Sequence, residues 1–197
     1  MEPVRFRSIK KELRIVGIDD GKPLPPTQSR SNLVGVIFRG GSWLDGLLRA
    51  TIKTDGMDST EKIVKMLKGS NHYGQIRIIM LHGLTFAGLN VVNLKQLCRR
   101  VERPAIVVMK EKPDYNRIEE AAKRLHDGEV KLKLLRDAGE PLPVVTKAGV
   151  PPIYIQAQGI GVEDAEKIVK LSSTHNSLPE PIRVANLIAS MLKPKSP

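Results

Sequence analysis

The chain has 197 residues, of which 41% are hydrophobic and 27% are charged. This composition is typical of a folded globular protein and is too apolar for a disordered one. The length favours a single domain over residues 1–197, with a short frayed tail over 193–197. Lys and Arg total 32 against 21 acidic residues, a formal net charge of +11. Such an excess favours a polyanionic partner, nucleic acid above all. A thermophile protein with many surface salt bridges can have a similar charge composition.

The cysteine and aromatic content exclude further kinds of site and of nucleic-acid contact. Cys98 is the only cysteine of the sequence, so disulfide frameworks and clustered cysteine metal sites within the chain are excluded. We expect a cytoplasmic protein with no membrane partner, because no apolar run approaches the ~20 residues of a membrane span. Aromatic residues are only 4%, so contact with nucleic acid should run mainly through phosphates rather than stacked rings.

The first part of the chain predicts an antiparallel meander. Leu13–Ile18 is a short apolar strand, and a Pro-rich loop at Lys22–Pro26 leads to a second strand at Asn32–Arg39. Gly40-Gly41 then predicts a hairpin turn. A third strand returns over Trp43–Thr54, where apolar and polar residues alternate.

The rest of the chain predicts helices and buried strands in alternation. Asp58 begins a helix with Glu61 placed for a capping box, and Gly69 ends it. Two short segments, Val130–Leu135 and Leu142–Val145, leave helix and strand open. The remaining expected elements are a strand at Ile76–Leu81, a helix at Asn90–Val101, a strand at Ala105–Met109, a helix capped by Asp114, a strand at Ile153–Ala157, and helices at Val162–Leu171 and Pro181–Leu192.

This order predicts an α/β fold of the ribonuclease H-like type. Its sheet is mixed, with an antiparallel three-strand meander followed by parallel strands, and helices flank it. A doubly wound open sheet is the alternative, but the early Gly40-Gly41 hairpin argues against strict βαβ alternation.

Acidic residues follow strands that such a sheet brings together. Asp19 and Asp20 end the first strand, Asp55 follows the third, and His82 follows the strand at Ile76–Leu81. Converging carboxylates can hold the divalent metal that phosphodiester cleavage needs. Turn chemistry explains Asp20-Gly21 and Asp55-Gly56 equally simply.

The segment 82–88 is an unusual loop, because it sets a histidine, a hydroxyl and an aromatic ring among glycines directly after a buried strand. Gly83, Thr85, Phe86 and Gly88 are its candidate ligand-binding residues. The alternative is a tight crossover in which the glycines only permit the turn. The sequence contains no Walker A, GxGxxG or CxxC motif.

Five segments together resemble one known family. They are 16–21 (VGIDDG), 34–40 (VGVIFRG), 55–60 (DGMDST), 84–90 (LTFAGLN) and 179–183 (PEPIR). The combination, which spans nearly the whole chain, is similar to the archaeal family called endonuclease dU. That family is itself similar to endonuclease V, which has a ribonuclease H-like fold and nicks DNA next to deaminated bases with magnesium.

The resemblance assigns roles to single residues. Asp19 resembles the first catalytic aspartate of endonuclease V, and Asp55 resembles the acid that closes its third strand. Lys110 resembles its active-site lysine, and His175 its late histidine. Arg183, in the segment 179–183, is a further candidate for substrate contact.

One position departs from the endonuclease V pattern, which has an aspartate where this chain has His82. Imidazole is a poor magnesium ligand and suits manganese or zinc better. Asp20 can replace the missing acid, or His82 can act as a general base. The favoured hypothesis is an Mg²⁺- or Mn²⁺-dependent endonuclease on DNA with a deaminated base, deoxyuridine by resemblance, with Asp19, Asp20 and Asp55 as metal ligands and with Lys110, His82 and His175 serving the chemistry. The alternatives are a nucleic-acid-binding protein without catalysis and a small-ligand-binding protein.

Overall fold

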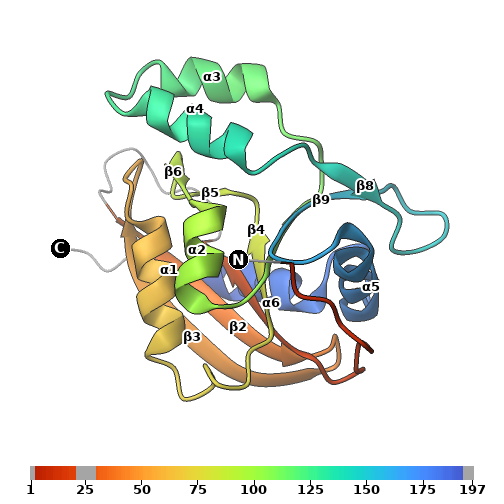
Figure 1. Cartoon of the computed structure of the whole chain (residues 1–197). Coiled ribbons are helices and arrows are strands. Elements are labelled where there is room, and N and C mark those ends of the chain that lie inside the picture. The colour runs from red at the N-terminus through yellow and green to blue at the C-terminus, as the bar shows by residue number, and fades with distance from the viewer. Residues whose placement is uncertain (1–2, 21–29, 193–197) are drawn as a thin grey trace.

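The computed structural model describes residues 3–20 and 30–192 (Figure 1). The predicted loop at Lys22–Pro26 and the tail at 193–197 lie outside these residues. The strands are β1 (Arg14–Asp19), β2 (Arg30–Arg39), β3 (Trp43–Lys53), β4 (Ile78–His82), β5 (Thr85–Phe86), β6 (Asn90–Val91), β7 (Ala105–Met109), β8 (Leu142–Val144) and β9 (Ile153–Gln158). The helices are α1 (Ser59–Lys68), α2 (Leu94–Val101), α3 (Tyr115–Ala122), α4 (Gly128–Asp137), α5 (Val162–Ser172) and α6 (Glu180–Met191).

The main sheet has seven strands in the order β3-β2-β1-β4-β7-β9-β8. β1, β2 and β3 pair antiparallel, whereas β1, β4 and β7 run parallel. β9 pairs antiparallel with β7, and β8 pairs antiparallel with β9 and forms the edge of the sheet. The predicted meander followed by parallel strands is confirmed. A doubly wound sheet is excluded, because β2 and β3 are joined by the hairpin at Gly40-Gly41 rather than by a helix.

Helices cover both faces of the sheet (Figure 1). Successive strand residues point to opposite faces, so Val16 and Ile18 pack with α1 and α2, while Ile15 packs on the side of α5 and α6. Gly17 faces α6, and a Cβ there would lie 2.2 Å from the carbonyl carbon of Pro181. A glycine is therefore required for α6 to lie this close to β1.

The capping box predicted for α1 is wrong. Asp58 precedes the helix but makes no capping bond, since its Oδ1 accepts from Lys53 N at 3.1 Å and from the Asn90 side chain at 2.7 Å. Asn90 Oδ1 accepts from Ser59 N at 3.0 Å instead, so a residue of β6 caps the helix. Glu61 pairs with Arg100 of α2 rather than with the cap.

Two other stretches differ from the sequence prediction. The helix predicted over Asn90–Val101 begins only at Leu94, because Asn93 caps it by accepting from Gln96 N at 2.9 Å. The preceding residues pair instead in the short hairpin of β5 and β6. The segments left open over 130–135 and 142–145 are resolved as α4 and β8. Within the described part of the chain, no helix is long and apolar enough to cross a membrane.

Candidate active site

Two adjacent acids stand at the carboxyl end of β1 and face opposite sides of the sheet. Asp19 is only 2% exposed. Its Oδ2 accepts from Asn186 of α6 at 2.8 Å, and its Oδ1 accepts from Asp20 N at 2.9 Å. Asp20 turns the other way and accepts from the backbone N–H of Ala87. Burial raises the pKa of Asp20 to about 6, with the charge of Asp19 adding to the rise while the Ala87 hydrogen bond opposes it.

His82 is the partner of Asp19 on the neighbouring parallel strand. Its Nδ1 lies 2.9 Å from Asp19 Oδ2, and a carboxylate acceptor requires the proton on Nδ1. Burial by itself would lower the pKa of His82, but the hydrogen bond to Asp19 and the charges of Asp19 and Asp20 outweigh it and raise the pKa above 6.5. This arrangement leaves Nε2 as the ring nitrogen available to a substrate or water.

Asp55 approaches the same loop from the other side. It is exposed, and its backbone has a left-handed φ of 50°. Asp55 N donates to Ala87 O at 2.8 Å and its Oδ1 accepts from Leu89 N at 2.8 Å. Asp20 and Asp55 therefore hold the same short stretch of backbone from two sides.

A buried lysine fixes the backbone of Asp55. Lys131 of α4 is fully buried, and its Nζ donates to Asp55 O at 2.6 Å and to Asp127 Oδ1 at 2.7 Å. The Lys131 ammonium holds the pKa of Asp127 below its usual value of 3.8. Nothing in the sequence singled out Lys131, which lies in the segment Val130–Leu135 that left helix and strand open.

The fit of these acids to a divalent metal follows from their donor atoms. Asp19 and Asp20 offer hard carboxylate oxygens in direct succession, the ligand type that Mg²⁺ and Mn²⁺ take. Asp19 is buried and Asp20 is half-buried, and burial is the main cause of the raised pKa of Asp20. Across residues 3–20 and 30–192, no group of three or more His, Cys, Asp or Glu side chains is placed to hold an ion. The ligand type therefore suits a divalent metal, but the side chains do not converge on one point: Asp20 Oδ2 and Asp55 Oδ1 accept from the backbone N–H groups of Ala87 and Leu89 instead.

The loop after β4 places its predicted binding residues unequally. Gly83 and Gly88 have φ values of 81° and 82°, and Thr85 is half-buried. Phe86 is only 1% exposed and belongs to the core that packs under α1 and α2. The role predicted for Phe86 is not available in this structure, because a period-two hairpin turns its ring inward while Thr85 stays at the surface.

Lys110 lies at the same edge of the sheet. It is exposed and directly follows β7, whose Val108 pairs with His82. Because β4 and β7 are adjacent and parallel, His82 and Lys110 stand at the carboxyl ends of neighbouring strands. The positive charge of Lys110 opposes the rise in the pKa of His82.

His175 and Arg183 both pair with Glu180 rather than with the acids at the end of β1. Thr174 Oγ1 donates to Gly41 O at 3.0 Å, in the hairpin beside the start of β1, and His175 Nδ1 lies 3.2 Å from Glu180 Oε1. Arg183 pairs with the same buried Glu180, its Nη2 2.6 Å from Oε2. β1 runs away from this hairpin towards Asp19, so His175 lies towards the other end of the strand from the acids. Arg183 is one turn before Asn186 on α6, and its guanidinium pairs with Glu180. Their predicted roles rest on the resemblance alone.

Asn186 was missed from the sequence. It is one turn beyond Arg183 on α6 and supplies the side-chain amide that holds Asp19. The available signal was an amide in the apolar run from Val184 to Ile188. Polar residues in such runs either face solvent or pair with a buried polar group, and the sequence does not distinguish these.

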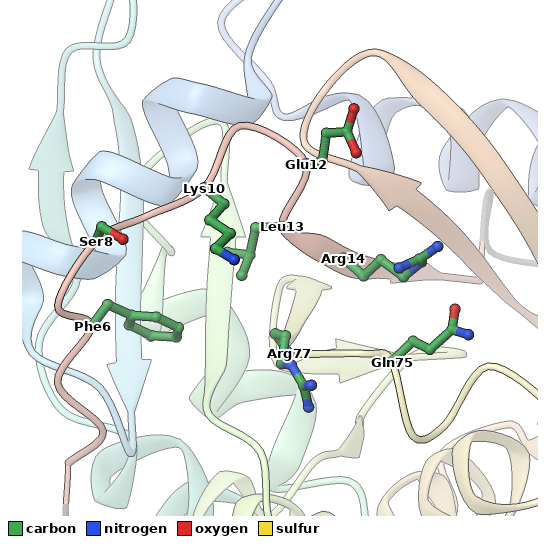
Figure 2. Close-up of a pocket in the computed structure, with 8 residues that line it drawn as sticks. All are labelled: Phe6, Ser8, Lys10, Glu12, Leu13, Arg14, Gln75 and Arg77. Carbon is green, nitrogen blue, oxygen red and sulfur yellow. The ribbon is translucent and has the colours of Figure 1, made fainter.

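A hollow in the surface lies at the opposite end of β1 from Asp19. It measures about 470 Å³, and Lys10, Glu12, Arg14 and Arg77 are among the eight residues that line it (Figure 2). Arg77 and Arg14 stand at the starts of β4 and β1, and Arg77 N donates to Arg14 O at 2.9 Å. Ligands of open α/β sheets bind outside the carboxyl ends of the strands, which favours the edge with Asp19 as the reaction site.

Comparisons with known proteins identify the family of this chain. The family model described as "Endonuclease dU" matches residues 11–193. The chain belongs to the endonuclease dU family. Proteins named UPF0215 are similar along nearly the whole chain. That of Methanosarcina acetivorans is 47% identical over 182 residues, covering 92% of this chain and 91% of the relative. That of Methanothermobacter thermautotrophicus is 46% identical, covering 96% and 92%.

Solved structures place this member of the endonuclease dU family among ribonuclease H-like proteins. A protein of unknown function from Archaeoglobus fulgidus superposes with a TM-score of 0.80 at 35% identity, covering 90% of this chain and 96% of that one. Endonuclease V from Bacillus subtilis gives 0.63 at 13% identity, covering 92% and 82%. Endonuclease V of Ciona intestinalis, solved with DNA containing an inosine followed by a ribo-adenosine, gives 0.61 at 16% identity, covering 89% and 84%. The predicted ribonuclease H-like fold is confirmed.

Proposed function

We propose that this protein is a divalent-metal-dependent endonuclease that nicks DNA at or next to a deaminated base, deoxyuridine in the first place, and so serves DNA repair. One observation carries the proposal: Asp19 and His82, at the carboxyl ends of the adjacent parallel strands β1 and β4, are 2.9 Å apart, and Asp20 directly follows Asp19. Membership of the endonuclease dU family supports the activity, and the net charge of +11 suits a DNA partner.

Asp19, Asp20 and Asp55 are the proposed metal ligands. When bound, Mg²⁺ or Mn²⁺ would supply Lewis-acid activation of the scissile phosphate and of the attacking water. Asn186 and the Asp20 N–H hold Asp19 in one orientation, so this carboxylate needs little rearrangement to act. Lys131 does the same for the backbone of Asp55.

His82 and Lys110 act on the phosphate in this proposal. Asp19 orients the imidazole through Nδ1, so Nε2 faces the substrate and can give or take a proton there. Lys110 is exposed at the same edge and stabilises negative charge on the phosphate oxygens. In this proposal His82 transfers protons, whereas the aspartate of endonuclease V at the same position would add a carboxylate ligand.

The test is a nicking assay on duplex DNA that carries one uracil, one hypoxanthine or no lesion, with Mg²⁺, Mn²⁺ or chelator. We expect lesion-dependent nicking that chelator abolishes. Asp19→Asn should lower the nicking rate by at least about 100-fold while circular dichroism shows a folded chain. Asp137→Asn makes the same chemical change at an exposed position near the end of α4 and should nick like the unmodified protein.

Two results would contradict the proposal. Nicking that survives Asp19→Asn would remove the acid pair from the reaction. Binding to DNA without nicking under every metal would favour a nucleic-acid-binding protein, whose affinity falls steeply with salt and needs no metal.

A further inference from the structure

A small cavity opens beside the candidate active site. It measures about 200 Å³ and lies between the loop after β4, the end of β7, the α3–α4 hairpin and β9. Gly83 and Met109 line it, and these residues are the chain neighbours of His82 and Lys110. In Figure 1 the two helices of the hairpin lie above β5 and β6 at this edge of the molecule. A group held in the cavity would thus sit next to the proposed reaction site.

The size and lining of the cavity suit one planar ring. Pockets for drug-sized ligands span about 300–1,000 Å³, so this cavity suits a smaller group, such as a single base. Its walls are largely apolar, with Leu84, Ile118 and Leu135 among them and the Tyr115 side chain beside them. Enzymes that act on an extruded base hold it between such side chains and read its pairing edge by hydrogen bonds.

Gln156 supplies the reading group. It lines the cavity from β9 and is only 4% exposed. Its Nε2 donates to Gly139 O, which fixes the orientation of the amide. Among the residues that the structure describes, Gln156 Oε1 is buried and has no hydrogen-bond partner. A buried acceptor left unpaired is unfavourable. Because Gln156 is part of the cavity wall, a donor held against that wall would satisfy its Oε1 once the amide turns towards it.

Deamination creates such a donor. Cytosine has an unprotonated N3 that can only accept, whereas uracil carries N3–H; adenine likewise has an acceptor at N1, whereas hypoxanthine carries N1–H. An acceptor in a dry pocket attracts the N–H and repels a ring nitrogen lone pair. Thymine also carries N3–H, so this contact separates a deaminated base from its parent and does not separate uracil from thymine.

We infer that the cavity under Gly83 receives the extruded deaminated base and that Gln156 Oε1 accepts a hydrogen bond from its ring N–H. This inference rests on the proposed function and names the residue that recognises the lesion. Gln156 is then a specificity-determining residue, distinct from the acids that carry the reaction.

The experiment measures DNA binding by fluorescence anisotropy in chelator, so that no cutting is required. The probes are oligonucleotide duplexes with uracil, cytosine or N3-methyluracil at one position opposite thymine. The unmodified protein should bind the uracil duplex at least about tenfold more tightly than the cytosine duplex. N3-methyluracil, which lacks the N–H, should bind no better than cytosine.

Gln156→Met keeps the length of the side chain and removes the acceptor. We expect its preference for uracil over cytosine to fall to about twofold or less. Gln158→Met is the matched control, because it makes the same change on the same strand and face but does not line the cavity. It should keep the full preference, and thermal unfolding shows that both variants are folded.

The outcomes separate the inference from the function beneath it. If folded Gln156→Met keeps its preference for uracil, or if the unmodified protein binds N3-methyluracil as tightly as uracil, the role of Gln156 is overturned while lesion recognition stands. If the unmodified protein shows no preference for uracil over cytosine, lesion recognition itself fails. The methylated probe tests the inference even where the Gln156 variant does not fold.

Discussion

Lys131→Met tests whether a buried lysine holds the site together. Lys131 is fully buried, and its ammonium donates to Asp55 O at 2.6 Å and to Asp127 Oδ1 at 2.7 Å. Methionine has a similar length but donates no hydrogen bond, so both acceptors lose their partner. Removal of one member of a buried ion pair costs about 3–5 kcal/mol. The Asp127 side chain is 17% exposed, so water can reach it and the lower end, about 3 kcal/mol, applies.

This loss is measurable by thermal unfolding. For a chain of this size, 1 kcal/mol shifts Tm by about 2–4 °C, so we expect a decrease of about 6–12 °C. Nicking should also fall, because Asp55 loses the anchor of its left-handed backbone. Lys123→Met is the control: its Nζ lies 2.6 Å from Glu120 Oε1, but both side chains are about two-thirds exposed, at 67% and 68%. An exposed pair contributes little, so this variant should stay within about 0.5 kcal/mol of the unmodified protein.

The pH dependence of the same pair has a defined sign. The hydrogen bond from Lys131 lowers the pKa of folded Asp127 below 3.8, so the stability it adds is complete above that value and is lost as the pH falls through the folded pKa. The urea midpoints of the unmodified protein and of Lys131→Met should therefore differ at about pH 7 and converge towards about pH 2. A Tm for Lys131→Met within about 2 °C of the unmodified protein would refute the reasoning, because the loss of stability would then be at most about 1 kcal/mol.

Three further predictions concern single side chains. Phe86→Ala should lower the free energy of unfolding by about 3–5 kcal/mol in a urea titration, because the ring is buried in the core. A loss below about 1 kcal/mol would contradict that burial. Gly88→Ala should lower both stability and nicking, because a Cβ there would lie 2.3 Å from Asp55 Oδ1. Gly149→Ala has a similar left-handed φ of 76° with no described atom within 4 Å of its Cβ, so equal effects of the two changes would rule out the contact with Asp55. Burial raises the pKa of the Cys98 thiol to about 12, so iodoacetamide at neutral pH should label it only in urea, as mass spectrometry can show; rapid labelling of the folded protein would contradict its burial.

Local patterns in the sequence were enough to predict most strands and helices. The strand at Ala105–Met109 was predicted with its observed bounds, since a continuous apolar run is the pattern of a strand covered on both faces. The N-terminal start of the first helix was less predictable. Asp58 has the usual N-cap chemistry, yet Asn90, more than 30 residues away in the chain, provides the hydrogen bond. A capping preference is local, and the competing partner came from the tertiary fold.

The candidate site divides in the same way. Asp19 and His82 were predicted because acids and histidines at the ends of adjacent parallel strands must share an edge of the sheet. Phe86 was misassigned, because the sequence shows a glycine-rich loop but not the two-residue pairing that turns the ring inward. His175 was assigned by resemblance to a motif, and such a motif carries no information about which end of a strand its loop reaches.

The sequence by itself determined the order of most elements, the ribonuclease H-like class, the basic charge and the acids at the end of the first strand. These follow from periodicity, turn residues and composition, which act over a few residues. Only the tertiary structure decided that Asn186 holds Asp19, that Lys131 anchors Asp55 and that Gln156, whose Oε1 has no partner among the described residues, lines a cavity. Each of these depends on a contact between segments that are far apart in the chain, and the hydrogen-bonding partner of a buried polar group is set by packing rather than by its neighbours in sequence.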